Sequence, residues 1–176
     1  MSSLKYEVVI LDRDGVLNVR NKSGYVLDMK DLVLAPDLGQ LSRLSSSNLS
    51  LVVATNQQCV GLGLITTEKA IMISQIPLMQ VGIVSPDVFL CPHLKSDDCN
   101  CRKPRSGLIE QALLHSKVSA GRVVMIGDSE SDLRAAENAR IDFLGVCWDG
   151  NCLGIVCCHT LSSAVDRILN TFADGV

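Results

Sequence analysis

The sequence predicts an α/β fold, a three-layer sandwich in which helices cover both faces of a mainly parallel sheet. Strand-like and helix-like segments alternate from one end of the chain to the other. The chain has 176 residues, of which 47% are hydrophobic, so a single domain over residues 1–176 can bury a sizeable core. Several strand-like runs end in polar clusters, which is where open α/β sheets place their chemistry.

The first strand is expected over Tyr6–Leu11, a nearly continuous apolar run typical of a strand covered on both faces. It leads directly into Asp12 and Asp14, after which Gly15 allows a sharp turn. Two carboxylates this close repel each other in a low dielectric, so we expect a divalent cation near them. A polar loop, Val19–Lys30, follows and is too long for a simple connector.

The other elements are predicted from apolar periodicity, capping residues and β-branched runs. Pro77 is expected to kink or split the helix that contains it. Cys157-Cys158-His159 is expected to end a core strand rather than to bind a metal. In chain order we expect a helix from Pro36–Asp37 to the Ser45–Asn48 run, strand Leu49–Ala54, loop Cys59–Leu64, helix Thr66–Val81, strand Asp87–Leu90, loop Pro92–Arg105, helix Ser106–Lys117, strand Arg122–Ile126, helix Ser131–Ala139, strand Phe143–Cys147 and helix Ser162–Phe172.

Polar residues gather where the predicted strands end. Because the carboxyl ends of parallel strands meet at one edge of a sheet, residues far apart in the sequence are expected to share one site there. The ends of the first four strands read DRD, TNQ, CPH and GDS, at Asp12–Asp14, Thr55–Gln57, Cys91–His93 and Gly127–Ser129.

These strand ends carry residue types suited to phosphoryl chemistry. One carboxylate of the pair Asp12/Asp14 can attack phosphorus while the other transfers protons. The Thr55 hydroxyl suits a phosphate oxygen, Lys103 can balance phosphate charge, and Asp128 is a natural magnesium ligand. Taken singly, Thr55 is better explained as part of a strand-to-loop turn, and Lys103 as a solvated surface side chain. The prediction of phosphoryl chemistry therefore depends on these residues occurring together. One turn beyond Asp128, Asp132 suits a helix cap and a role in the site equally well.

A second cluster predicts a structural zinc site in the loop 91–101. Three thiols and one imidazole lie within this short stretch, at Cys91, His93, Cys99 and Cys101. That set matches a closed tetrahedral site. Because so polar a loop buries little apolar surface, a bound metal explains how it becomes ordered; zinc in small peptides contributes on the order of 10–16 kcal/mol. Cys59, Cys147 and Cys152 are interpreted as small apolar residues, and without a secretory signal we expect no disulfides.

Together the motifs resemble the haloacid dehalogenase (HAD) phosphohydrolase superfamily. Its four signatures occur in order and span nearly the whole chain: LDRDG at Leu11–Gly15, ATN at Ala54–Asn56, RKP at Arg102–Pro104 and GDSESD at Gly127–Asp132. The resemblance implies a Rossmann-like core, Asp12 as nucleophile and Asp14 as general acid/base. It further implies Mg²⁺ held by Asp12, the Asp14 backbone carbonyl and Asp128, with Thr55 and Lys103 holding the phosphoryl group.

The CPH…CxC loop resembles a small group within that superfamily that has no cap domain. The group holds the heptose bisphosphate phosphatases of lipopolysaccharide precursor synthesis and the histidinol-phosphate phosphatases. DRDGVLNV…GYV and KPRSGL favour the heptose branch, so heptose 1,7-bisphosphate is the expected substrate, with histidinol phosphate or another small sugar phosphate as the alternative. The substrate contacts implied are Gly15, Asn18, Tyr25, Asn56, Gln57 and Arg102.

Two positions depart from the heptose pattern. Leu62 stands where those enzymes usually carry arginine, and Ser129 where they commonly carry lysine. Both differences remove positive charge, so we expect the hydrolytic chemistry to persist while affinity for a second phosphate falls.

Composition restricts the other classes of function. The net charge of −3 argues against a nucleic-acid-binding protein. No apolar run is long enough to span a bilayer, and the amino-terminal run is too short for a signal peptide, so a cytoplasmic monomer is expected. A receiver-type signalling domain also uses Asp, Thr and Lys around Mg²⁺, but it needs a phospho-acceptor after its third strand, where this chain has Cys91-Pro92-His93. A catalytically inactive zinc module is disfavoured because every motif residue is present.

Overall fold

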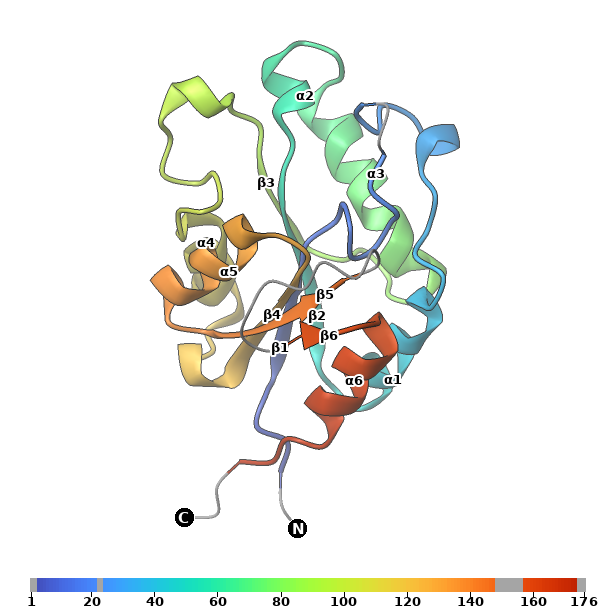
Figure 1. Cartoon of the computed structure of the whole chain (residues 1–176), viewed down its shortest axis with the longest axis vertical. Helices are drawn as coiled ribbons and strands as arrows, with labels where there is room; N and C mark the ends of the chain where they lie inside the picture. The colour runs from blue at the N-terminus through green and yellow to red at the C-terminus, as the bar shows by residue number, and fades with distance from the viewer. Residues whose placement is uncertain (1–2, 22–23, 148–156, 174–176) are drawn as a thin grey trace.

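The computed structural model describes residues 3–21, 24–147 and 157–173 (Figure 1). Its strands form one six-stranded parallel sheet in the order β3-β2-β1-β4-β5-β6. This arrangement confirms the predicted α/β class with a parallel sheet. The strands are β1 (Val8–Leu11), β2 (Ser50–Asn56), β3 (Val88–Cys91), β4 (Val123–Gly127), β5 (Asp142–Val146) and β6 (Cys157–Cys158).

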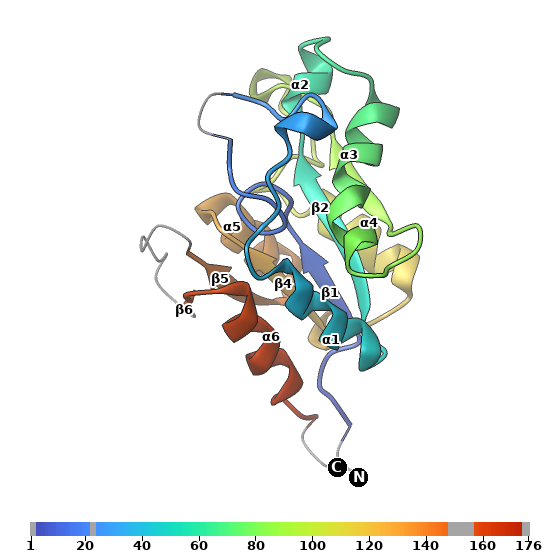
Figure 2. The same ribbon diagram turned by 90° about the vertical axis from the view of Figure 1, so that its right-hand side faces the viewer.

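Helices pack on both faces of this sheet (Figure 2). Short 3₁₀ turns at 29–31, 38–40, 95–97 and 120–122 add to them. The helices are α1 (Leu41–Ser46), α2 (Gln58–Gly61), α3 (Thr67–Gln80), α4 (Gly107–Ser116), α5 (Glu130–Ala139) and α6 (Leu161–Leu169).

The central strand β1 divides its side chains between the two faces because successive residues of a strand point in opposite directions. Val9 and Leu11 pack in a core with residues of α1 and α6. Val8 and Ile10 pack in a second core with residues of α4 and α5. All four are buried, as the continuous apolar run predicts. The result is the predicted three-layer sandwich.

Two local expectations differ from the structure. The stretch after β2, predicted as a loop, contains the short helix α2, whose last turn is held from outside: Gly61 N donates to Pro92 O at 2.9 Å. That contact comes from a segment some thirty residues away, which local periodicity cannot reveal. Helix α3 runs through Pro77 without interruption. Pro77 is buried in its packing, which offsets the one hydrogen bond that proline cannot donate.

The Sγ atoms of Cys147 and Cys157 lie 2.9 Å apart. Cys157 is disulfide-bonded, so the expectation that the chain has no disulfides is wrong. Cys147 follows β5 and Cys157 begins β6, and these strands are paired. Cys157–Cys158 is therefore the end of a core strand, as predicted. The pairing of these strands brings the Cys147 thiol next to the sulfur of Cys157. Cys152 lies outside the described residues.

Strand register brings the site residues to one edge. Leu11 of β1 pairs with Val53 of β2 and with Ile126 of β4, so the residues that follow these positions lie side by side. Above this edge rise residues 24–35, α2 and the loop after β3 (Figure 1). No separate cap domain covers it among the described residues. Within the same ranges, no helix is long and apolar enough to cross a membrane.

Candidate active site and metal centre

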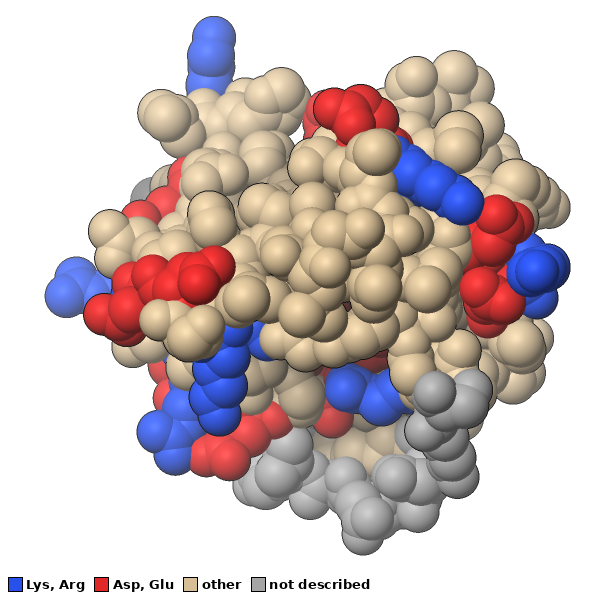
Figure 3. Space-filling view, turned by 90° about the horizontal axis from the view of Figure 1, so that it is seen from above, with Lys and Arg blue, Asp and Glu red and all other residues tan. Residues whose placement is uncertain are grey.

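Three carboxylates converge at the carboxyl edge of the sheet. Asp12 follows β1, Asp128 follows β4 and Asp132 lies in the first turn of α5, and one oxygen of each lies within 4.8 Å of the others. Gly15 makes this approach possible. Its φ is +98°, and a Cβ at this position would lie 1.8 Å from Asp128 Oδ2. Figure 3, which looks down on this edge, shows basic side chains next to acidic ones in a recess of the surface.

Lys103 is the buried cation of this cluster. Its Nζ lies 2.9 Å from Asp12 Oδ1 and 2.6 Å from Asp132 Oδ1, and it donates to Ala54 O at 2.8 Å. Burial alone would lower the pKa of Lys103, but the two adjacent carboxylates outweigh it and raise that pKa. Lys103 is therefore fixed as a cation with all three donors directed at oxygens.

The carboxylates carry more negative charge than Lys103 alone can balance. Burial, together with the negative charge of Asp132, raises the pKa of Asp12 to about 7. Burial also raises the pKa of Asp128. A divalent cation would favour the ionised forms of both groups, and clustered carboxylate oxygens are the ligands that Mg²⁺ prefers. The residues present therefore fit the expected magnesium site.

Asp14 has different surroundings, although it is only two residues from Asp12. Its carboxylate accepts hydrogen bonds from Arg13 (Nη2, 2.7 Å), Gln57 (Nε2, 2.9 Å) and Asn18 (Nδ2, 3.0 Å). Burial would raise the pKa of Asp14, but the charge of Arg13 and these hydrogen bonds outweigh it and lower that pKa. Asp14 is thus held as an oriented carboxylate.

The end of β2 contributes three consecutive polar side chains. Thr55 is buried, and its Oγ1 accepts a hydrogen bond from Gln57 Nε2 at 2.8 Å. Asn56 clamps the backbone of Lys103 from both sides, since its Nδ2 donates to Lys103 O and its Oδ1 accepts from Lys103 N, both at 3.0 Å. Asn56 and Gln57 therefore position other site residues, and Asn18 is likewise fully buried against Asp14.

Asp132 combines the two roles that the sequence left open. Its Oδ2 accepts from Ser129 N at 3.1 Å and from Ser129 Oγ at 2.6 Å, which caps α5. Its Oδ1 faces Lys103. The helix cap and the charge cluster are therefore one structure, and Asp132 is fully buried within it.

The predicted zinc ligands also come together. Neighbouring ligand atoms of this set lie 3.2–3.7 Å apart, and all four lie within 4.8 Å of one another. The edge of a Zn–S tetrahedron measures about 3.8 Å. Burial and the adjacent thiols raise the pKa of Cys91 to about 12, so without a cation this thiol stays protonated. The geometry and donor set of Cys91, His93, Cys99 and Cys101 therefore fit a closed zinc site.

The zinc loop is tied to the site by a chain of polar contacts. Arg102 donates from Nη1 to His93 O at 3.1 Å and from Nη2 to Gln58 Oε1 at 3.4 Å. Gln58 in turn donates to the Tyr25 hydroxyl at 2.6 Å. The predicted substrate contacts Tyr25 and Arg102 are thus linked through Gln58 of α2.

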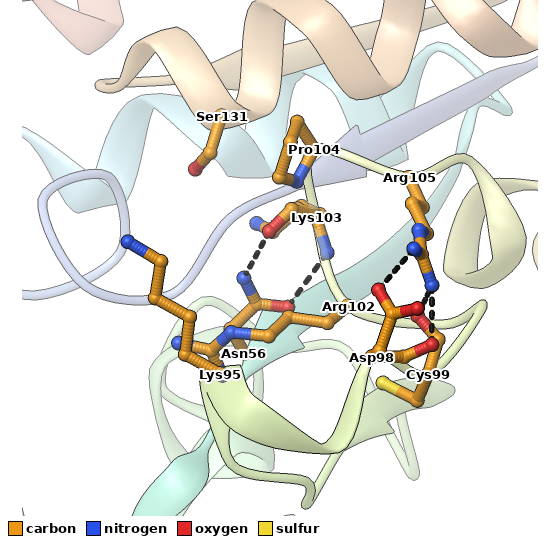
Figure 4. A pocket seen from close by; sticks show the side chains of 9 residues that line it. All are labelled: Asn56, Lys95, Asp98, Cys99, Arg102, Lys103, Pro104, Arg105 and Ser131. Carbon is orange, nitrogen blue, oxygen red and sulfur yellow. Dashed lines mark hydrogen bonds and ion pairs between the residues drawn. The ribbon is translucent and has the colours of Figure 1, made fainter.

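A cavity of about 370 Å³ opens beside Lys103, between this loop and the start of α5 (Figure 4). Arg105 in its wall is paired with Asp98. The described lining is Asn56, Lys95, Asp98, Cys99, Arg102, Lys103, Pro104, Arg105 and Ser131.

Two arginines in the site were not predicted. Arg13 stands between the two signature carboxylates and is only 1% exposed, so its position within the motif could have suggested a structural cation. Arg20 contacts Asp128 through Nη2 at 2.7 Å, although it lies in a polar loop with no periodicity. No spacing or composition signal indicates that contact, because it depends on how the loop folds back.

Comparison with known proteins supports the same reading. A family model described as haloacid dehalogenase-like hydrolase matches residues 40–146. The chain is 34% identical over 137 residues to the D-glycero-beta-D-manno-heptose-1,7-bisphosphate 7-phosphatase of Bordetella bronchiseptica, covering 76% of each chain. It is 36% identical over 135 residues to the corresponding alpha-anomer enzyme of Mycobacterium tuberculosis, covering 74% of this chain and 71% of that one.

Among solved structures, the chain is similar to the D,D-heptose 1,7-bisphosphate phosphatase of B. bronchiseptica, crystallised with magnesium and phosphate. The TM-score is 0.81 at 30% identity, over 93% of this chain and 98% of that chain. The chain is also 32% identical to the histidine biosynthesis bifunctional protein HisB of Blochmanniella floridana, but that match covers only 39% of the bifunctional protein.

Proposed function

Because this chain belongs to the haloacid dehalogenase-like hydrolase family and is a phosphatase, we propose that it removes the 7-phosphate of a D-glycero-D-manno-heptose 1,7-bisphosphate. The observation that carries this proposal is the pairing of Asp12 with Lys103 beside a separately held Asp14. Relatives that act on this substrate match most of the chain, and both anomers occur among their names.

In the first step Asp12 acts as the nucleophile. Its Oδ1 is held by Lys103 Nζ at 2.9 Å and by Arg13 N at 2.8 Å. No hydrogen bond among the described residues holds Oδ2, which is therefore the attacking oxygen. Oδ2 forms a bond to phosphorus as the bond to the sugar oxygen breaks, and this gives an aspartyl phosphate. Lys103 and the Thr55 hydroxyl offset the charge that builds on the phosphoryl oxygens.

Asp14 moves the protons in both steps. Because its pKa is lowered in the free protein, Asp14 must take up a proton as the negatively charged substrate binds beside it, and it then gives this proton to the departing sugar oxygen. The resulting carboxylate then takes a proton from water, whose oxygen attacks the aspartyl phosphate and releases inorganic phosphate and Asp12. Gln57 and Asn18 fix the direction in which Asp14 points, which matters because proton transfer needs hydrogen-bond distance.

We assign the divalent cation to Asp12, Asp128 and the backbone carbonyl of Asp14. When bound there, Mg²⁺ neutralises the carboxylates and polarises the phosphoryl group. Zinc is assigned to the cysteine and histidine cluster, where it would order the loop that carries Arg102 and Lys103. This second metal has no part in the chemistry.

The cavity beside Lys103 supports a substrate with a second anionic group. Lys95, Arg102 and Arg105 line it, and Lys95 has no ion-pair partner among the described residues. This cluster compensates in part for the arginine and lysine that Leu62 and Ser129 replace. Leu62, at the end of α2, is about half exposed and offers no charge.

A substrate panel tests the proposal. We expect phosphate release to be fastest with the two heptose 1,7-bisphosphate anomers, slower with histidinol phosphate and slowest with common hexose phosphates. Lys95→Ala should raise KM for the bisphosphates more than for monophosphates, while Lys117→Ala, on the surface past α4, should change neither. If histidinol phosphate is the best substrate, the partial match to the bifunctional histidine protein reflects the true activity and the heptose assignment is wrong.

A further inference from the structure

Arg20 lies across the carboxylate cluster from the solvent side. Its Nη2 donates to both oxygens of Asp128, at 2.7 and 2.8 Å, and its Nε lies 3.2 Å from Asp128 Oδ2. The same Nη2 donates to the backbone carbonyl of Asp14 at 3.3 Å. The guanidinium therefore bridges the ends of β4 and β1 with a single nitrogen.

These acceptors are the ones assigned to the divalent cation. Asp128 and the Asp14 carbonyl supply two of its three protein ligands, and both are engaged by Arg20. Two cations that draw on the same oxygens repel each other, and each lowers the affinity for the other. With Arg20 in place, the three carboxylates face two cations, Arg20 and Lys103, of which only Lys103 is buried.

We propose that Arg20 is a built-in competitor of the divalent cation for Asp128 and the Asp14 carbonyl. Metal binding then requires the guanidinium to leave. This inference rests on the proposed function only in taking those two groups as metal ligands.

Exposure sets the strength of this competition. The Arg20 side chain is 58% exposed, whereas that of Asp128 is 15% exposed, so the arginine can return to water at little cost. The carboxylate has less access to water and depends on a cation. Arg20 is therefore a weak competitor that covers the site when the metal is scarce and yields when it is abundant. Lys103 cannot take this role, because three oxygens hold it inside the protein.

Calorimetric titration of Mg²⁺ into the zinc-loaded, full-length protein tests this inference without any substrate. Arg20→Ala should bind Mg²⁺ roughly three- to tenfold more tightly than the wild type at matched ionic strength. Arg20→Lys should fall between them, because a lysine cannot engage both oxygens in parallel. Arg43→Ala is the matched control: it removes the same charge from a surface ion pair with Asp166, between α1 and α6.

Thermal unfolding supplies an independent readout. Arg20→Ala should unfold at a lower temperature than the wild type in the absence of Mg²⁺, and should gain more from saturating Mg²⁺. Unchanged or weaker Mg²⁺ binding in Arg20→Ala overturns the inference, as does an equal gain in Arg43→Ala. Turnover at saturating Mg²⁺ separates this inference from the proposed function. If the wild type is active but Arg20→Ala binds Mg²⁺ no more tightly than it does, the competition is rejected and the proposed function stands. If the wild type is inactive but Arg20→Ala binds Mg²⁺ more tightly, only the proposed function is rejected.

Discussion

At the residue scale, neighbours decide what each of the two signature carboxylates can do. Asp12 is buried against Asp132 and Lys103, and its pKa is raised to about 7. Asp14 is held by Arg13 and two side-chain amides, and its pKa is lowered. The chain leaves β1 after Leu11 and turns between Arg13 and Gly15, so the two aspartates do not share the environment that residues two apart in a strand would share. Asp12 faces Lys103, which can balance phosphate charge, whereas Asp14 is oriented by Arg13 and two amides. This placement is the basis for proposing attack by one and proton transfer by the other.

The exchange Asp12→Asn tests the nucleophile. We expect phosphate release to fall by a factor on the order of 10⁴ or more, because an amide cannot form the covalent intermediate. The fold should persist, since Lys103 keeps Asp132 and the Ala54 carbonyl as partners. Phosphate release and thermal unfolding measure the two effects, with Glu137→Gln on α5 as a charge-matched control. Turnover within tenfold of the wild type would rule out Asp12 as the nucleophile.

At the scale of elements, the zinc loop behaves as one unit with the start of α4. Gly107, the first residue of that helix, is packed so closely that a Cβ would lie 2.5 Å from Asn100 O. The loop is short of apolar contacts, and its ordered shape carries Arg102 and Lys103 into the site. We therefore expect the stability of this loop to depend on zinc held by its four sulfur and nitrogen ligands.

Metal analysis checks this dependence. The purified protein should contain one zinc ion per chain, and Cys99→Ser should remove it and lower turnover, because Lys103 would lose its support. Cys158→Ala, in the core next to α6, should lose stability but keep its zinc. Full zinc occupancy in Cys99→Ser, or none in the wild type, would contradict the assignment.

A second element-scale prediction concerns the start of the chain and β5. Asp142 accepts hydrogen bonds from Tyr6, at 2.8 Å, and from Lys5. Burial would raise the pKa of Asp142, but these two partners outweigh it and lower that pKa below the ordinary 3.8. A lowered folded-state pKa stabilises the fold above the unfolded value, and this stabilisation is lost as the pH falls through the folded value.

Asp142→Asn should therefore lower the free energy of unfolding at pH 7, by less than about 1 kcal/mol because the group is half exposed. The difference from the wild type should shrink as the pH falls below 3.8. Denaturant unfolding at several pH values measures it. A difference that grows toward acid would mean that the pKa is shifted the other way.

At the scale of the whole molecule, Lys103 and its carboxylate partners form a buried charge cluster at the carboxyl edge of the sheet. Lys103 connects β1, β2 and α5 through three oxygens, while the chain as a whole carries a net charge of only −3. Removing one partner of a buried ion pair costs about 3–5 kcal/mol. That is a large share of the roughly 5–15 kcal/mol by which a domain is stable.

Lys103→Met should therefore destabilise the entire protein as well as abolish turnover. We expect the melting temperature to fall by roughly 10 °C. Lys95→Met, which removes an exposed lysine from the same loop region, should leave it nearly unchanged. Differential scanning calorimetry compares the variants. Equal melting temperatures would show that Lys103 contributes to the chemistry without contributing to the fold.

The sequence by itself determined the layers, the parallel sheet and which polar residue types gather at the strand ends, because these depend on local periodicity and on the residues that follow each strand. Only the tertiary structure decided which of these polar side chains contact one another. Asp132 serves both a helix cap and Lys103, Asn56 and Gln57 hold other residues, and Arg20 covers Asp128. Apart from the local cap between Asp132 and Ser129, each of these contacts joins segments that are distant in the chain or fold back across a loop. Their geometry is set by packing and by competition between charges, and neither leaves a periodic trace in the sequence.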